Sequence, residues 1–145
     1  MIDYELSNDP ANMAVLRKVS AEHGIALIAS FHDFRTTPDA ATLDAKFRAA
    51  QAAGADVAKV AVMPQTPQHV LDLLAATDRA RKAIRLPIIS MSMGGIGSLS
   101  RIIGWVYGSA ATFAVGQSSS APGQIAIEDL RVALASVRSA VLGTR

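Results

Sequence analysis

The stretch VAKVAVMP, residues 57–64, decides the fold and raises the first functional question. Valine and alanine occupy both faces of this run, which predicts a short strand buried on both sides, as the strands of parallel sheets are. Lys59 stands inside the run, although removing an ammonium ion from water costs several kcal/mol unless a partner compensates its charge. Lys59 is therefore either a functional residue or a lysine at an exposed edge of the sheet.

Four similar runs, rich in apolar and β-branched residues, stand at intervals along the chain. They are IDYEL (2–6), IALIASF (25–31), PIISMSM (87–93) and AATFAV (110–115). Helical patterns separate the runs, and the last pattern, at 127–142, places its apolar residues on one stripe. Alternation of strand and helix with a repeat of roughly 30 residues is typical of βα units and predicts a parallel sheet.

Three of the helices carry the same start signal, a capping residue followed by proline. The capping residues are Asp9, Thr37 and Thr66, in the stretches SNDPANM, TTPDAAT and QTPQHVL. The first two helices should end near Gly24 and Gly54, because glycine adopts the left-handed conformation of a helix cap without strain.

A parallel sheet covered by helices is either an open doubly wound sheet or part of a (β/α)8 barrel. GGIGS at 94–98 lacks the spacing and the acidic residue of a dinucleotide-binding fingerprint, so it is either a flexible turn or an anion-binding loop. Polar side chains at strand ends, among them His32 and Lys59, favour the barrel. We therefore expect an α/β fold, a single domain over residues 1–145 with about five of the eight βα units of a TIM barrel.

Composition argues against several classes of function. The chain has 145 residues, no cysteine, scattered basic residues, a formal charge of +2 and only 5% aromatic residues. Scattered charge and few aromatics do not suit a nucleic-acid surface, and no apolar run approaches the ~20 residues of a membrane span. The lack of cysteine excludes thiolate chemistry and fits a reducing compartment, so we expect a cytoplasmic protein.

Lys59 and His32 form the chemical core of the prediction. Strand alternation puts Lys59 on one face with Val57, Ala61 and Met63. If this face is the barrel interior, burial favours the free amine, which attacks a ketone to form an imine. His32 ends the preceding strand, so both side chains should lie at the same mouth of the barrel. There a histidine removes the proton from the carbon next to the imine and then donates a proton to a leaving hydroxyl.

Other polar residues leave alternatives open. Asp3 and Glu5 share one face of the first strand and form either a polar floor beside Lys59 or part of an exposed edge. Arg101 follows the glycine-rich loop, where a guanidinium is able to clamp a carboxylate. The loop SSSAPGQ (118–124) offers hydroxyl and amide donors to a polyol.

Together these features resemble the type I 3-dehydroquinate dehydratases of the shikimate pathway. The matching stretches are IDYEL, SFHDF, GADVAKVAVMPQT, IISMSMG, SRIIGWVYGSAATF and SAPGQIAIEDLR. They cover nearly the whole chain in the right order, and the combination of HDF with KVAVMP is highly specific. The resemblance implies a (β/α)8 barrel that removes water from 3-dehydroquinate to give 3-dehydroshikimate, with neither an organic cofactor nor a metal.

The resemblance also implies a role for each candidate site residue. Lys59 matches the Schiff-base lysine of the family, and His32 matches its general acid/base. The implied substrate-binding residues are Arg101 for the carboxylate, Ser120 and Gln124 in the last loop, and Met91, Met93 and Phe113 around the ring.

The chain departs from the family because it begins at what resembles the fourth strand. The acidic residue that orients the histidine, and further pocket residues, would belong to the first three βα units. Five strands do not close an eight-stranded barrel, so we expect open edges at 2–6 and 110–115. The ring-wall residues Met91, Met93 and Phe113 should then face water. We therefore expect association, as a homodimer or with a separate N-terminal half.

Two other functions stay open beside the dehydratase. One is another class I Schiff-base barrel, such as an aldolase, that uses GGIGS for a sugar phosphate. Arg101 and SAPGQ favour a carboxylate-bearing polyol over a phosphate. The other is a truncated barrel fragment, catalytically weak or silent, that acts by association with itself or a partner chain.

Overall fold

The computed structural model describes residues 1–118 and 121–143 and contains one parallel sheet in that part of the chain. Its strands are β1 (Ile2–Glu5), β2 (Leu27–Asp33), β3 (Val57–Val62) and β4 (Ile88–Ser92). Each strand pairs in parallel with the next one in the sequence, so their order in the sheet is the order in the chain. The α/β class and the parallel strands predicted from the repeat are confirmed.

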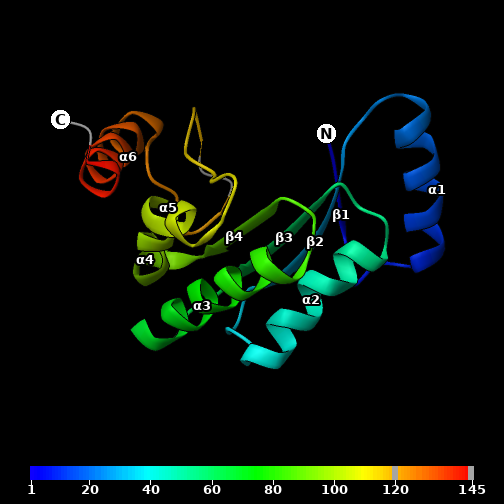
Figure 1. Cartoon of the computed structure of the whole chain (residues 1–145), viewed down its shortest axis with the longest axis horizontal. Coiled ribbons are helices and arrows are strands. Elements are labelled where there is room, and N and C mark those ends of the chain that lie inside the picture. The colour runs from blue at the N-terminus through cyan, green and yellow to red at the C-terminus, as the bar shows by residue number, and fades with distance from the viewer. Residues whose placement is uncertain (119–120, 144–145) are drawn as a thin grey trace.

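The first three helices alternate with the strands and pack on one face of the sheet, and the other helices follow β4. They are α1 (Pro10–Glu22), α2 (Ala40–Ala52), α3 (Pro67–Ala83), α4 (Gly94–Gly97), α5 (Leu99–Ile103), the 3-10 helix η1 (Gly104–Tyr107) and α6 (Ile127–Leu142). Figure 1 shows α2 and α3 side by side across the sheet, with α1 beyond β1 at one end and α6 at the other. No helix of the described residues is both long and apolar enough to cross a membrane.

The predicted cap of α1 and the predicted glycines after α1 and α2 are confirmed. Asp9 caps α1 by accepting a hydrogen bond from the Ala11 amide at 2.9 Å, and Gly24 and Gly54 follow α1 and α2 with φ of +63° and +73°. The GGIGS stretch was expected to be a flexible turn or an anion-binding loop. Four of its residues instead form helix α4.

The predicted cap of α2 is wrong. Asp39, not Thr37, caps the helix, and its carboxylate accepts a hydrogen bond from the Thr42 amide at 2.7 Å. The Thr37 hydroxyl instead donates to the carbonyl of Met63 at 3.3 Å, which ties the start of α2 to the end of β3. Thr66 does precede α3, but its side chain makes no capping bond.

The main hydrophobic core lies between the sheet and its helices. Alternate residues of β2, β3 and β4 point into it and meet the inner sides of α2 and α3. Leu27, Ala29, Leu43, Phe47 and Leu73 are completely buried there. This packing uses one face of the sheet, so the other face is left for the site.

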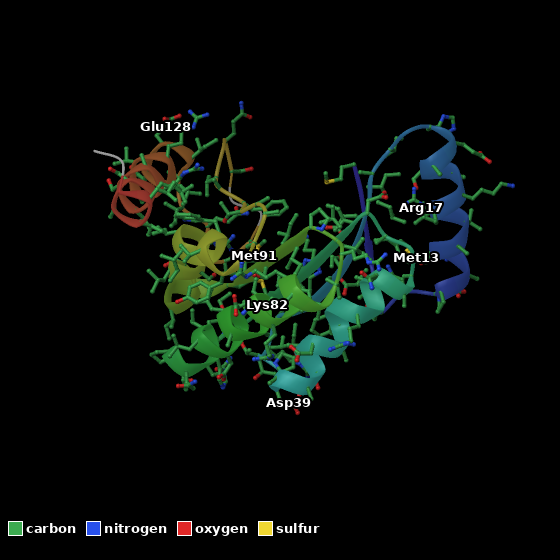
Figure 2. All side chains as sticks on the ribbon, viewed as in Figure 1. Met13, Arg17, Asp39, Lys82, Met91 and Glu128 are labelled. Atoms are coloured by element: carbon green, nitrogen blue, oxygen red, sulfur yellow. The ribbon has the colours of Figure 1, made fainter. Side chains whose placement is uncertain are left out.

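The opposite face carries a second, smaller cluster that includes Met91 and Met93. These two side chains are only 4% and 1% exposed, so the expectation that they face water is wrong, whereas Phe113 is 38% exposed as expected. The loop after η1 explains why Met91 and Met93 are buried. The Gly94 amide donates a hydrogen bond to the carbonyl of Pro122, which holds this loop over the end of β4. In Figure 2, Met91 lies in the middle of the molecule, beside β4.

The expected fifth strand, 110–115, does not join the sheet. Only isolated bridges form there, Ile88 with Ser109 and Val115 with Ala126. Side chains bond to backbone groups that would otherwise pair β4 with a fifth strand. The Ser90 amide donates to the Ser109 hydroxyl, and the carbonyl of Phe113 accepts from the guanidinium of Arg101. The described residues therefore form four strands, not the expected five.

Candidate active site

Strand register brings four ionisable side chains to the sheet face that α2 and α3 do not cover. Glu5 lies opposite Ser30 of β2, and Ser30 lies opposite Lys59 of β3. Asp3 precedes Glu5 by two residues and His32 follows Ser30 by two, so alternation puts all of them on one face. This face is the only one on which a lysine and a histidine of neighbouring strands meet in this sheet.

Lys59 has an ionic partner, which explains how a lysine is tolerated in a buried strand. Its side chain is 10% exposed, and its Nζ lies 2.6 Å from Oδ2 of Asp3. The same nitrogen lies 5.1 Å from the centre of the Phe113 ring, a cation–π distance. Because β3 runs between β2 and β4, the alternative of a lysine at a sheet edge is excluded. The carboxylate and the ring together offset the cost of burying the ammonium.

His32 is held by the second carboxylate of β1. Its Nδ1 pairs with Oε2 of Glu5, and its backbone amide donates to Oε1 of Glu5 at 3.1 Å. Glu5 also accepts from the Ser30 hydroxyl at 3.3 Å, and the His32 ring stacks on Phe34 with 5.7 Å between centroids. With Nδ1 engaged, Nε2 is the ring nitrogen left for a ligand.

The open question about Asp3 and Glu5 is thereby answered. Both carboxylates form a polar floor beside Lys59 and His32, and neither is merely part of an exposed edge. The histidine has an orienting carboxylate within this chain, Glu5, whereas the resemblance implied that such a residue belongs to the first three βα units of the family. The alternation along IDYEL predicted that Asp3 and Glu5 share one face of the strand. It did not predict the partner of each carboxylate, because that depends on the register between the strands.

One cavity joins most of the predicted site residues. It has a volume of about 150 Å³ and is lined by His32, Lys59, Met91, Met93, Phe113 and Gln124, together with Phe34, Ala61 and Ala121. Phe34 was not among the predicted site residues, although it is the last residue of the HDF motif. Larger cavities occur elsewhere, but none of them contains Lys59 or His32. The chemistry of the lining, not the size, makes this cavity the candidate site.

Arg101 lies one layer behind this cavity. The side chain is buried, and it donates from Nε to the carbonyl of Gly123 at 2.9 Å and from Nη2 to that of Pro122 at 3.2 Å. Its Nη1 donates to the carbonyl of Phe113 at 3.2 Å and contacts the sulfur of Met91. No carboxylate pairs with it among the described residues, and burial lowers the pKa of its guanidinium. Arg101 thus holds the loop that forms one wall of the cavity.

Two further expectations concern Ser120 and metals. Ser120 lies outside the described residues. Within residues 1–118 and 121–143, no group of three or more histidine, cysteine, aspartate or glutamate side chains is arranged to hold a metal ion.

The described residues thus combine a parallel βα sheet with a buried lysine and a carboxylate-bound histidine, and both of these side chains line one pocket. The sequence model of the type I 3-dehydroquinase family matches residues 1–140, and the chain belongs to this family.

Curated relatives agree with this membership. The 3-dehydroquinate dehydratase of Albidiferax ferrireducens is 53% identical over 141 residues, which make up 97% of this chain and 53% of the relative. That of Aromatoleum aromaticum is 54% identical over 98% of this chain and 55% of its own length. The chain therefore spans about half the length of the curated relatives it matches.

Solved structures give the same result. The 3-dehydroquinate dehydratase of Geobacillus kaustophilus superposes with a TM-score of 0.92 and 48% identity, over 94% of this chain and 53% of that one. The type I enzyme of Clostridium difficile, solved with covalently modified comenic acid, superposes with a TM-score of 0.90 and 38% identity, over 96% of this chain and 55% of that one.

The loop that Arg101 holds generates a prediction. Gly123 has φ of +73°, and a Cβ there would lie 2.1 Å from the carbonyl oxygen of Gly94. Gly123→Ala should destabilise the fold by about 1–3 kcal/mol, because it adds backbone strain and a steric clash. Gly116→Ala is the matched control, since a Cβ there meets nothing within 4 Å. Urea unfolding of both variants checks this, and equal stabilities would show that the loop is not held as described.

Proposed function

We propose that this chain carries the lysine and histidine of a 3-dehydroquinate dehydratase, which converts 3-dehydroquinate to 3-dehydroshikimate and water within the shikimate pathway. The observation that carries the proposal is the pairing of Lys59 with Asp3 and of His32 with Glu5 around one cavity, in a chain of the type I 3-dehydroquinase family. We also propose a cytoplasmic location, which the absence of cysteine supports.

The first step is the formation of an imine on Lys59. The amine attacks the ketone of the substrate, and loss of water leaves a C=N bond between Nζ and the former carbonyl carbon. The imine withdraws electrons from the adjacent carbon, so a proton on that carbon becomes more acidic. Burial of Lys59 keeps bulk water away from this bond.

The second step is proton transfer by His32. Nε2 takes the proton from the carbon next to the imine, and the electron pair moves to form an enamine. The enamine expels the hydroxyl group, to which the histidinium returns its proton, so water leaves. Glu5 supports both directions, because its contact with Nδ1 fixes the ring and stabilises the charged form. Hydrolysis of the imine then releases the product.

Substrate binding uses the cavity walls and the loop behind them. We propose that Met91, Met93 and Phe113 contact the ring, and that Gln124 and Ser120 bind its hydroxyl groups. Arg101 would bind the substrate carboxylate. The support is that this buried cation contacts only neutral groups among the described residues, three carbonyl oxygens and the sulfur of Met91, whereas an anion would compensate its charge. Binding then exchanges one of its loop carbonyls for the carboxylate.

Completion of the site requires association, either of two copies or with a separate chain that supplies the N-terminal βα units. Within the described residues, β1 pairs only with β2, which leaves its other edge open. Apolar residues of α6 are also exposed, among them Val132, Val141 and Leu142. An open strand edge and exposed apolar side chains favour contact with another chain, so both features support the proposed association. A weak or silent fragment that acts by association is the second candidate function, favoured by the same edge.

The Schiff base is tested by trapping with borohydride. The parent chain incubated with 3-dehydroquinate and borohydride should gain the mass of one reduced adduct, located on Lys59. Lys59→Ala should abolish the adduct, because Lys59 carries the only buried amine among the described residues. Lys82→Ala should leave it intact, since the Lys82 amine pairs with Asp78 on the exposed side of α3. Peptide mapping that places the adduct on Lys82 or Lys46 would defeat the assignment.

The role of His32 is tested by separating imine formation from water loss. His32→Ala should still give the adduct on Lys59, while the rate of water loss falls by about 10²–10⁴-fold, the usual contribution of a general acid/base. Absorbance of the conjugated product measures water loss, and intact mass measures trapping. His69→Ala is the control, because His69 lies on α3 and does not line the cavity. If His32→Ala kept most of the parent rate, the histidine would be structural.

Association is tested by sedimentation over a dilution series. The isolated chain should self-associate, most simply as a dimer, because open strand edges and exposed apolar residues favour contact with another chain. Dehydration by the isolated chain should be weak, and addition of an N-terminal half from a full-length relative should raise it. A compact monomer that persists at high concentration, and whose rate an added half leaves unchanged, would contradict this.

A further inference from the structure

The two carboxylates of β1 differ in how they are held. Glu5 is held by three contacts, from the Ser30 hydroxyl, the His32 amide and the His32 ring. The Asp3 carboxylate has one side-chain partner among the described residues, the Nζ of Lys59 at 2.6 Å. Asp3 is also 37% exposed, whereas Lys59 is 10% exposed. Glu5 is therefore fixed in place, while Asp3 is bound only to the reacting amine and has access to solvent.

An amine attacks a ketone only after its ammonium form has lost a proton. We propose that Asp3 is a catalytic residue that accepts this proton from Lys59 and later returns it to the departing oxygen. The inference rests on the proposed function, because it concerns the formation of the imine on Lys59. The distance of 2.6 Å is that of a short, charge-assisted hydrogen bond, along which a proton moves without rearrangement of the site.

The proton balance of the step is complete with these two residues. Asp3 takes one proton from the ammonium, and the free amine forms a bond to the carbonyl carbon while the C=O electron pair moves to oxygen. A second proton moves from nitrogen to that oxygen, which gives a carbinolamine. The proton held by Asp3 then goes to the hydroxyl group, the C–O bond breaks, and water leaves with the protonated imine. Asp3 is a carboxylate again at the end.

No other group around Lys59 is equally suited to this transfer. From β1, Glu5 is occupied by Ser30 and His32. From β2, His32 keeps Nε2 for the proton on the substrate carbon, and among the described residues the amine of Lys59 bonds to Asp3 and not to this ring. β4 and the residue after it present the apolar Met91 and Met93 to the same cavity. The Phe113 ring accepts no proton, and Arg101, behind Met91, is a cation. Among the described residues, Asp3 alone is an acceptor in contact with the amine.

The test uses the whole chain, the variants Asp3→Asn and Asp3→Glu, and Asp72→Asn as a control for loss of one surface carboxylate. Two reactions of Lys59 are measured at the same pH. The first is acetylation by acetic anhydride, read at Lys59 by peptide mass. The second is borohydride trapping, with 3-dehydroquinate and, separately, with cyclohexanone, a ketone that lacks the polar groups of the substrate.

The two reactions should move in opposite directions in Asp3→Asn. Acetylation of Lys59 should rise several-fold, because the nitrogen is no longer held in an ion pair with the carboxylate of Asp3. Trapping of both ketones should fall by about 10²-fold, because no group transfers the proton between nitrogen and oxygen. Asp3→Glu should recover part of the trapping rate, and Asp72→Asn should match the parent chain in both reactions.

Other outcomes overturn the inference. If acetylation and trapping both fall in Asp3→Asn, or if neither changes, Asp3 has a structural role or none. The same holds if the parent chain traps neither ketone. Failure of the proposed function is a different result. In that case the parent chain traps cyclohexanone but not 3-dehydroquinate, and the opposite changes in Asp3→Asn are still observed.

Discussion

The ion pair between Lys59 and Asp3 is the interaction on which the arrangement of this molecule depends. An ammonium in the middle strands of a sheet is tolerated only with a compensating charge, and Asp3 supplies it from β1. The pair also requires one register between β1 and β2, since a slip by one residue turns Asp3 and Glu5 to the helix-covered face. Lys59 would then lose its counter-ion and His32 its orienting carboxylate. Register, burial and chemistry are therefore coupled in this sheet.

The two faces of the sheet have different roles, since one forms the main core and the other carries the candidate site. One face packs on α2 and α3 and supplies the main core, so most of its side chains are apolar, and the buried hydroxyl of Thr77 donates to that of Ser90. The other face carries the ionisable residues and a small apolar cluster. Arg101 links this face to the loop after η1 through three carbonyl oxygens, and the loop covers Met91 and Met93. The cavity is thus bounded by the sheet on one side and by a loop held from behind on the other.

Much of this arrangement was predictable from local patterns. The apolar runs and the cap at Asp9 predicted the strands and the first helix, because alternation and proline-linked capping are local properties. The meeting of Lys59 with His32 followed from consecutive βα units, since their strands end at one edge of the sheet. The family resemblance was carried by the same short stretches.

Other features depend on contacts between distant residues and were not predictable. The pairing of Asp3 with Lys59 required the strand register, and the burial of Met91 required the loop that Arg101 holds. The run 110–115 has the composition of a strand, yet the guanidinium takes the carbonyl of Phe113 that a ladder would use. At α2, Asp39 caps the helix because the Thr37 hydroxyl bonds to the end of β3 instead.

A double-mutant cycle on Lys59 and Asp3 tests the central claim most directly. The free energy of unfolding is measured for the parent chain, Asp3→Asn, Lys59→Met and the double variant. The surface pair of Arg79 and Asp44 is measured in the same way for comparison. The interaction free energy between Lys59 and Asp3 should lie within about 0.5–3 kcal/mol and exceed that of the surface pair. A carboxylate that compensates a buried ammonium stabilises the fold more than a carboxylate in an exposed ion pair does. Additive effects of the two substitutions would contradict the claim that this ion pair holds the site together.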